Sequence, residues 1–122
     1  MPIRFPLQVR RAPALEETVD GWQQEASSGR GEGSRDARQR LKELRRLEGL
    51  FPRKPFLGRN VPKNLIPRRY KDQGIANLFR NDLPGAWRLL HTVMEVGGEQ
   101  AVIELDALSH PDYDRLFGYE KR

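Results

Sequence analysis

Apolar residues occupy every second position from Ile3 to Val9 at the start of the chain. This period of two is typical of a strand that buries one of its faces. Pro6 lies within the alternation, and a proline cannot donate a hydrogen bond to a neighbouring strand. The pattern therefore predicts an edge strand over residues 3–10.

Helical spacing replaces this alternation after Pro13, a residue that suits the first turn of a helix. Two apolar stripes follow, the first through Leu15, Val19, Trp22 and Ala26 and the second through Leu41, Leu44, Leu47 and Phe51. Residues 27–33 are rich in Gly and Ser and predict a flexible connector, and Ser34 or Asp36 is the expected cap of the second helix. Two amphipathic helices joined in this way predict an antiparallel helical hairpin.

Apolar segments and turn residues alternate in the last third of the chain. We expect strands over residues 75–79, 86–96 and 100–107, with a turn at Pro84-Gly85 and a hairpin turn at Gly97-Gly98. Strands this close in sequence, without crossover helices, must pair as antiparallel neighbours. The order of elements predicts an α+β fold, in a single domain over residues 1–122, with the helices on one face of the sheet.

The loop between the two longest strands decides which side chains share a face. A three-residue loop over residues 97–99 aligns the odd-numbered positions of 87–93 with the odd-numbered positions of 101–107, and it separates apolar from polar residues better than a two-residue loop does. The helices are then expected on the odd-numbered face, where His91 packs in the core opposite Leu105. Arg88 is expected on the open face.

Arg88 is a charged residue within an otherwise apolar strand. It must pair with a carboxylate, reach water or bind a ligand, because a buried and unpaired charge is too costly. A structural ion pair with Glu104 or Asp106 is one possibility, and an anionic ligand is the one we favour. The hairpin returns the chain to Arg88 at residue 108, so we expect His110 and Tyr113 near the same end of the sheet.

The composition indicates a polyanionic partner. The net charge is +5 at pH 7 and the sequence pI is near 10.0, which is typical of nucleic-acid-binding proteins. There are no cysteines, and the two histidines lack the spacing of metal ligands, so we expect no metal. No apolar run approaches the ~18 residues of a membrane span, and the start of the chain lacks a signal-peptide pattern, so we expect a cytoplasmic protein that binds no membrane.

Positive charge is concentrated in two segments. The second predicted helix carries Arg38, Arg40, Lys42, Arg45 and Arg46 outside its apolar stripe, and we interpret this face as a solvated surface. Residues 52–71 form a long basic arm, interrupted by prolines, that contains seven Lys or Arg residues and no Asp or Glu. The arm either covers the core or contacts phosphates, with Phe56 and Tyr70 available for base stacking, and the lack of acidic residues favours phosphate contact.

Two short motifs occur together in the last third of this chain. Trp87-Arg88-Leu89-Leu90 follows Leu-Pro-Gly, and Ser109-His110-Pro111-Asp112-Tyr113 follows the last predicted strand, ahead of a Phe-Gly-Tyr tail. This combination resembles the RelE/ParE superfamily of toxins from type II toxin–antitoxin systems, closely over residues 75–119 and in layout over the helical hairpin. The resemblance implies a RelE-like toxin that cuts mRNA, commonly on the ribosome, without a metal or small-molecule cofactor, and that a cognate antitoxin protein silences.

The resemblance also implies roles for individual residues. Arg88 matches the strand arginine that stabilises the pentacoordinate phosphorane, and Arg80 falls near the basic position before the turn. His110, Tyr113 and Tyr119 fall where acid, base or stacking groups occur. The RNA backbone would be held by basic residues of the arm, which are Lys54, Arg68, Arg69 and Lys71.

Two other functions fit the same sequence. A ParE-like toxin has this fold, poisons DNA gyrase by binding and has no active site of its own. A basic RNA-binding module would bind RNA with salt-sensitive affinity and would not cleave it. Loss of the residues around Arg88 would leave a gyrase binder active and would inactivate a nuclease, so this cluster discriminates between them.

Overall fold

The computed structural model describes residues 3–118. Five strands form one sheet in the order β1-β5-β4-β3-β2, in which β1 pairs with β5 in parallel and all other pairs are antiparallel. The strands are β1 (Gln8–Arg11), β2 (Arg59–Asn60), β3 (Phe79–Leu83), β4 (Trp87–Val96) and β5 (Glu99–Leu108), and the helices are α1 (Pro13–Ser27), α2 (Glu32–Leu50), the 3-10 turn η1 (Lys63–Leu65), α3 (Arg68–Lys71) and α4 (His110–Phe117). The predicted α+β fold class is confirmed.

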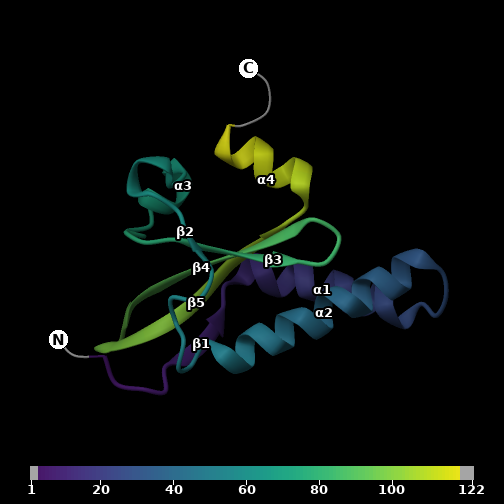
Figure 1. Cartoon of the computed structure of the whole chain (residues 1–122), viewed down its shortest axis with the longest axis horizontal. Helices are drawn as coiled ribbons and strands as arrows, with labels where there is room; N and C mark the ends of the chain where they lie inside the picture. The colour runs from purple at the N-terminus through teal and green to yellow at the C-terminus, as the bar shows by residue number, and fades with distance from the viewer. Residues whose placement is uncertain (1–2, 119–122) are drawn as a thin grey trace.

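The helical hairpin follows the sequence pattern, whereas the edge strand is shorter than predicted, because β1 begins at Gln8 and Phe5 of the predicted strand is 50% exposed. The predicted apolar stripes of α1 and α2 are buried against one face of the sheet (Figure 1), and β1 forms an outer edge as expected. The predicted cap of α2 is wrong, because the helix begins at Glu32 after Gly31. Ser34 lies inside α2, where its hydroxyl donates to the carbonyl of Ala26 at 2.9 Å and joins the two helices.

The strand predicted over residues 75–79 is displaced along the chain. β3 begins at Phe79 and includes the polar residues Arg80, Asn81 and Asp82. Before β3, the Asn77 side chain, and not the backbone, forms the hydrogen bonds to β4. Its Oδ1 accepts from the amide of Val93 at 2.9 Å and its Nδ2 donates to the Val93 carbonyl at 3.0 Å. Pairing with β4 therefore makes residues 79–83 a strand, although three of these residues are polar.

The β4–β5 hairpin has a two-residue loop, so the predicted three-residue loop is wrong. Val96 pairs directly with Glu99, and Gly97 and Gly98 both adopt positive φ, which is the conformation of a type I′ turn. A bulge then shifts the register, because His91 pairs with Glu104 while Leu90 pairs with Asp106. The register predicted around Leu89 and Ala107 is therefore correct, and the register towards the turn is displaced by one residue.

The bulge changes which β5 side chains face the helices. Val102 belongs to the core under α1 and α2, whereas Leu105 belongs to a second core on the other face. The second core is covered by the segment that carries α3 and by α4, which lie across the sheet from the hairpin (Figure 1). Helices lie on both faces of the sheet, so the expectation of helices on one face only is wrong, because the bulge adds Leu105 to the face that carries Leu90. Within residues 3–118, no helix is long and apolar enough to cross a membrane.

Gly58, where the chain turns into β2, is expected to be intolerant of substitution. Its φ is +110°, and a Cβ at this position would lie 2.6 Å from both the Arg80 carbonyl oxygen and Asn81 Oδ1. We expect Gly58→Ala to lower the free energy of unfolding by about 2–3 kcal/mol, since it combines a strained backbone with a steric clash. Gly74→Ala, with φ +81° and no atom within 4 Å of the added Cβ, is the matched control in urea unfolding. Equal losses for the two variants would contradict the close approach at Gly58.

Candidate anion-binding site

Two arginines from neighbouring strands lie on the face of the sheet opposite the helical hairpin. Arg80 of β3 pairs with Leu90, and Asp82 of β3 pairs with Arg88 of β4. Paired residues and positions two apart on a strand share a face, so Arg80, Asp82 and Arg88 stand on the same face as Leu90. Leu90 belongs to the second core, which places this cluster at the edge of that core.

The two guanidinium groups converge on one carboxylate. Arg80 Nε lies 3.6 Å and Arg88 Nε lies 3.5 Å from Oδ1 of Asp82, whose side chain is 68% exposed. Both arginine side chains are about four-fifths buried, at 19% and 20% exposure, and neither Nε atom has a hydrogen-bond partner. The cluster thus holds two desolvated donors that a single exposed carboxylate compensates weakly.

The ring of Tyr113 in α4 lies close to both arginines. Its ring centroid lies 5.7 Å from the Arg80 Cζ atom and 5.8 Å from the Arg88 Cζ atom, within the range of cation–π attraction. The ring is buried and stacks on Phe117 at 4.4 Å. The expected proximity of Tyr113 to Arg88 is confirmed, and its geometry is that of a platform that orients the guanidinium groups.

A third arginine extends the cluster across the sheet. Arg59 of β2 lies directly opposite Arg80, and a surface groove at this edge is lined by Gly58, Arg59, Arg80, Asn81 and Asp82. The sequence did not identify Arg59 or Asp82 as site residues. The lack of acidic residues around Arg59 was the available signal, but its position beside Arg80 depends on the β2–β3 pairing.

His110 and Tyr119 are placed differently from Tyr113. His110 is the first residue of α4 and is 56% exposed, with its Nε2 3.1 Å from Oδ2 of Asp114. No hydrogen bond or ion pair of the described residues joins His110 to Arg80 or Arg88. Tyr119 lies outside the described residues.

The basic residues of the arm divide into two groups. Arg69 forms an ion pair with Asp106 at 2.9 Å, and the Tyr70 hydroxyl donates to the same carboxylate. Burial of the Tyr70 phenol is the main reason why the Tyr70 pKa lies above its ordinary value, and the nearby Asp106 carboxylate is the second. The contacts of Arg69 and Tyr70 with Asp106 fix the arm to β5. Lys54, Arg68 and Lys71 are exposed and form no ion pair with any carboxylate of residues 3–118.

The structural ion pairs considered for Arg88 do not form. The bulge places Glu104 on the helix side, where Arg11 lies 3.8 Å from it, and Asp106 is bound by the arm. The nearest carboxylate to Arg88 is that of Asp82, on the preceding strand. Arg40 of the predicted solvated face is also buried, because its guanidinium lies between the rings of Trp22 and Trp87 at 5.1 and 4.8 Å.

His91 is a core histidine, as its place on the helix face predicts, although it pairs with Glu104 rather than Leu105. It is fully buried, with Nε2 donating to the Pro55 carbonyl at 2.7 Å and Nδ1 accepting from Asn81 at 3.1 Å. Burial lowers the His91 pKa to about 4. A neutral imidazole with both nitrogens engaged joins the start of the arm to the sheet.

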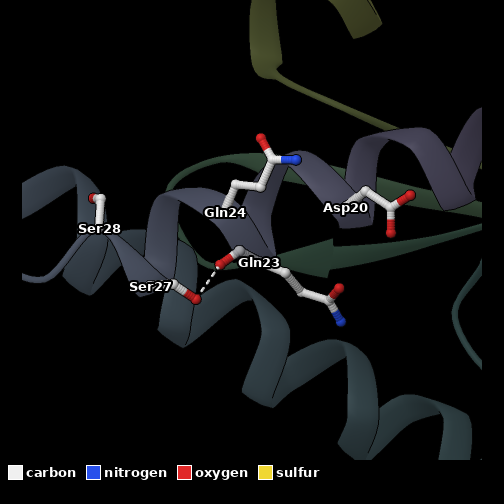
Figure 2. A pocket seen from close by; sticks show the side chains of 5 residues that line it. All are labelled: Asp20, Gln23, Gln24, Ser27 and Ser28. Atoms are coloured by element: carbon white, nitrogen blue, oxygen red, sulfur yellow. Dashed lines mark hydrogen bonds between the residues drawn. The ribbon is translucent and has the colours of Figure 1, made fainter.

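The other surface hollows offer less chemistry than the arginine cluster. One follows α1 and is lined by exposed polar side chains, with Gln23 and Gln24 pointing away from each other (Figure 2). The Ser27 hydroxyl donates to the Gln23 carbonyl and the Ser28 hydroxyl to the Glu25 carbonyl, each at 2.8 Å. Residues 3–118 contain no group of three or more His, Cys, Asp or Glu side chains that could hold a metal ion.

Comparison of the chain with protein-family models, curated proteins and solved structures found no match.

Proposed function

We propose that this protein is a RelE-like toxin that cleaves single-stranded RNA. In the cell, the proposed substrate is the mRNA that a ribosome is translating. The observation that carries the proposal is the convergence of Arg80 and Arg88, whose buried Nε atoms have no hydrogen-bond partner. Within the described part of the chain, the only carboxylate close to this pair is that of Asp82, and its Oδ1 lies 3.5–3.6 Å from the two Nε atoms, too far for a short hydrogen bond. The pair therefore suits a phosphodiester, which can accept charge-assisted hydrogen bonds from both arginines, better than it suits a structural role.

The reaction is an internal transfer at phosphorus. The ribose 2′-hydroxyl gives up its proton and attacks the adjacent phosphate, a pentacoordinate phosphorane forms, and the 5′-oxygen of the next nucleotide leaves with a proton. The products are a 2′,3′-cyclic phosphate and a free 5′-hydroxyl. Negative charge grows on the equatorial oxygens during this step, and donors fixed before the reaction stabilise that charge most effectively. In the proposal, Arg88 and Arg80 supply these donors and Tyr113 holds them in place.

We assign proton transfer to His110, with Tyr119 as a second proton-transfer or stacking group. His110 follows the residue pair Arg88–Leu108 by two positions, and the Asp114 carboxylate at 3.1 Å fixes the orientation of its imidazole, as acidic partners do for catalytic histidines. The proposed reaction uses no metal and no small-molecule cofactor.

The proposal includes two macromolecular partners in the cytoplasm. Exposed cations of the arm, Lys54, Arg68 and Lys71, are available to the backbone of mRNA or ribosomal RNA, where each phosphate contact adds salt-dependent affinity. A cognate antitoxin protein would keep the toxin inactive. A ParE-like gyrase binder and a non-catalytic RNA-binding module remain the competing functions that the test below separates.

Induction in cells tests the proposal directly. We expect the wild-type protein to arrest growth and to produce discrete breaks in abundant transcripts, detected by primer extension, and the double variant Arg88→Ala/His110→Ala to do neither. Immunoblotting must show equal soluble amounts of the two proteins. Arrest and RNA breaks that persist in the double variant would contradict the assigned site, arrest without breaks would favour a gyrase binder, and no arrest would favour an RNA-binding module.

A further inference from the structure

Arg59 and Arg80 face each other directly across the β2–β3 pair. Like charges at directly opposite positions destabilise a sheet, so this arrangement needs a compensating anion. Asp82 is the one carboxylate among the residues that line the groove, and its Oδ1 lies between Arg80 and Arg88. No ion pair links Arg59 to a carboxylate of residues 3–118, so its exposed guanidinium lacks a counter-charge.

The backbone approaches β3 closely beside these arginines. Gly58 passes so close to the Arg80 carbonyl and the Asn81 side chain that a Cβ would lie 2.6 Å from each. The residue that precedes Arg59 therefore contributes no side chain to the groove, and the Asn81 amide is fixed by its contact with His91 at 3.1 Å. The groove thus has two cations among its lining residues.

We propose that the groove lined by Arg59 and Arg80 is a second phosphate subsite, which binds the RNA phosphate next to the one held by Arg80 and Arg88. This inference rests on the proposed function and specifies its substrate as single-stranded RNA with at least two consecutive phosphates. Neighbouring strands are 4.7–4.9 Å apart, so β2 and β4 are separated by about 10 Å. Adjacent phosphates of a single strand lie closer together than this, but the long side chains of Arg59 and Arg88 can lean towards β3 between them, so that Arg80 is shared between two consecutive phosphates.

Asp82 competes with RNA in this arrangement. Three guanidinium groups and one carboxylate give the cluster a local charge of +2 (three minus one), and the Asp82 side chain is exposed enough to turn away when a phosphate arrives. We therefore expect Asp82→Asn to bind RNA more tightly than the wild type, because the competing carboxylate is lost.

Binding of uncleavable RNA analogues tests the subsite separately from cleavage. The probes are 2′-O-methyl oligonucleotides, which lack the attacking hydroxyl, prepared without terminal phosphates as a dinucleotide with one phosphate and a trinucleotide with two. We expect Arg59→Gln to weaken binding of the trinucleotide about tenfold and to reduce its salt slope by about 0.7, the value for one phosphate contact on a single strand. Binding of the dinucleotide is expected to stay within twofold of the wild-type value.

Two further variants control for charge and for folding. Arg35→Gln removes the same charge from an exposed position on α2, on the opposite side of the sheet, and should leave the salt slope unchanged. Arg59→Lys should recover most of the affinity for the trinucleotide, and thermal unfolding should show that all variants are folded.

Three results would overturn the subsite. These are equal effects of Arg59→Gln and Arg35→Gln, an equal effect of Arg59→Gln on the two probes, and weaker trinucleotide binding by Asp82→Asn. The proposed function is judged by RNA breaks in cells, so the two can fail independently. If the protein binds the probes as expected but does not cut RNA, the subsite is supported and the proposed activity is contradicted. If the protein cuts RNA and Arg59→Gln has no effect on trinucleotide binding, the activity is supported and the subsite is contradicted.

Discussion

Replacing Arg88 by alanine is expected to lower the rate constant of RNA cleavage by about 10²–10³, the usual effect of removing one preorganised donor to a developing oxyanion. In the proposed reaction, the ring of Tyr113 at 5.8 Å and the strand pairing of β4 with β3 hold Arg88 in place. Single-turnover cleavage of an RNA oligonucleotide, at protein concentrations above the dissociation constant, measures the chemical step without the binding step.

The same experiment separates charge from geometry at Arg88. Arg88→Lys keeps the positive charge and loses the planar fork that binds two phosphate oxygens at once, so we expect it to recover only part of the lost rate. Binding of an uncleavable analogue should weaken less than the rate constant falls, since the interaction strengthens in the transition state. A rate constant for Arg88→Ala within threefold of the wild-type value would contradict the assignment.

Arg11→Met is expected to lower the free energy of unfolding by about 1.5–3 kcal/mol, the range for losing hydrogen bonds to a charged group, because the Arg11 and Glu48 side chains are only partly buried, at 25% and 20% exposure. Arg11 of β1 donates to both carboxylate oxygens of Glu48 at 2.8 and 3.0 Å, and it lies 3.5 Å from Glu16 and 3.8 Å from the fully buried Glu104. Methionine keeps most of the aliphatic volume, so the loss reports on the missing cation. Urea unfolding followed by circular dichroism measures it.

The loss caused by Arg11→Met should grow as the pH rises. Burial and, after it, the neighbouring Glu48 raise the pKa of Glu104 to about 10, from 4.5 in the unfolded chain, although Arg11 opposes both effects. In the wild type the stability from protonated Glu104 is complete below pH 4.5 and declines towards pH 10, by at most ~1.4 kcal/mol per pH unit. The variant also loses the cation that holds the Glu48 pKa below its ordinary value, so its deficit should be larger at pH 9 than at pH 5.

Arg46→Met is the matched control for this cluster. Arg46 forms an ion pair of similar length, 2.7 Å to Glu43, on the exposed surface of α2, where water and salt screen the interaction. Its replacement should leave unfolding almost unchanged at both pH values. A loss for Arg11→Met no larger than that for Arg46→Met, or one independent of pH, would contradict the coupling of Glu48 and the buried Glu104 to Arg11.

The candidate site was accessible from the sequence in part. Arg88 was identifiable because a charge in an apolar strand must have a partner or a ligand, and Tyr113 because the hairpin returns the chain to the same end of the sheet. Arg80 was proposed from the family resemblance, and β3 places it beside Arg88. Arg59 was missed as a site residue, because β2 is two residues long and nothing in its local pattern predicts a strand.

The sequence by itself determined the helical hairpin with its apolar stripes and the two long strands of the β-hairpin, because these depend on local periodicity and on turn residues. It also determined the positive charge of the arm. The tertiary structure alone decided the two-residue hairpin loop and the bulge beside His91, which place Glu104 with Arg11 and Leu105 in a second core. A slip of one residue exchanges the faces of a strand, so the partners of each charged side chain depend on long-range pairing that local pattern does not contain.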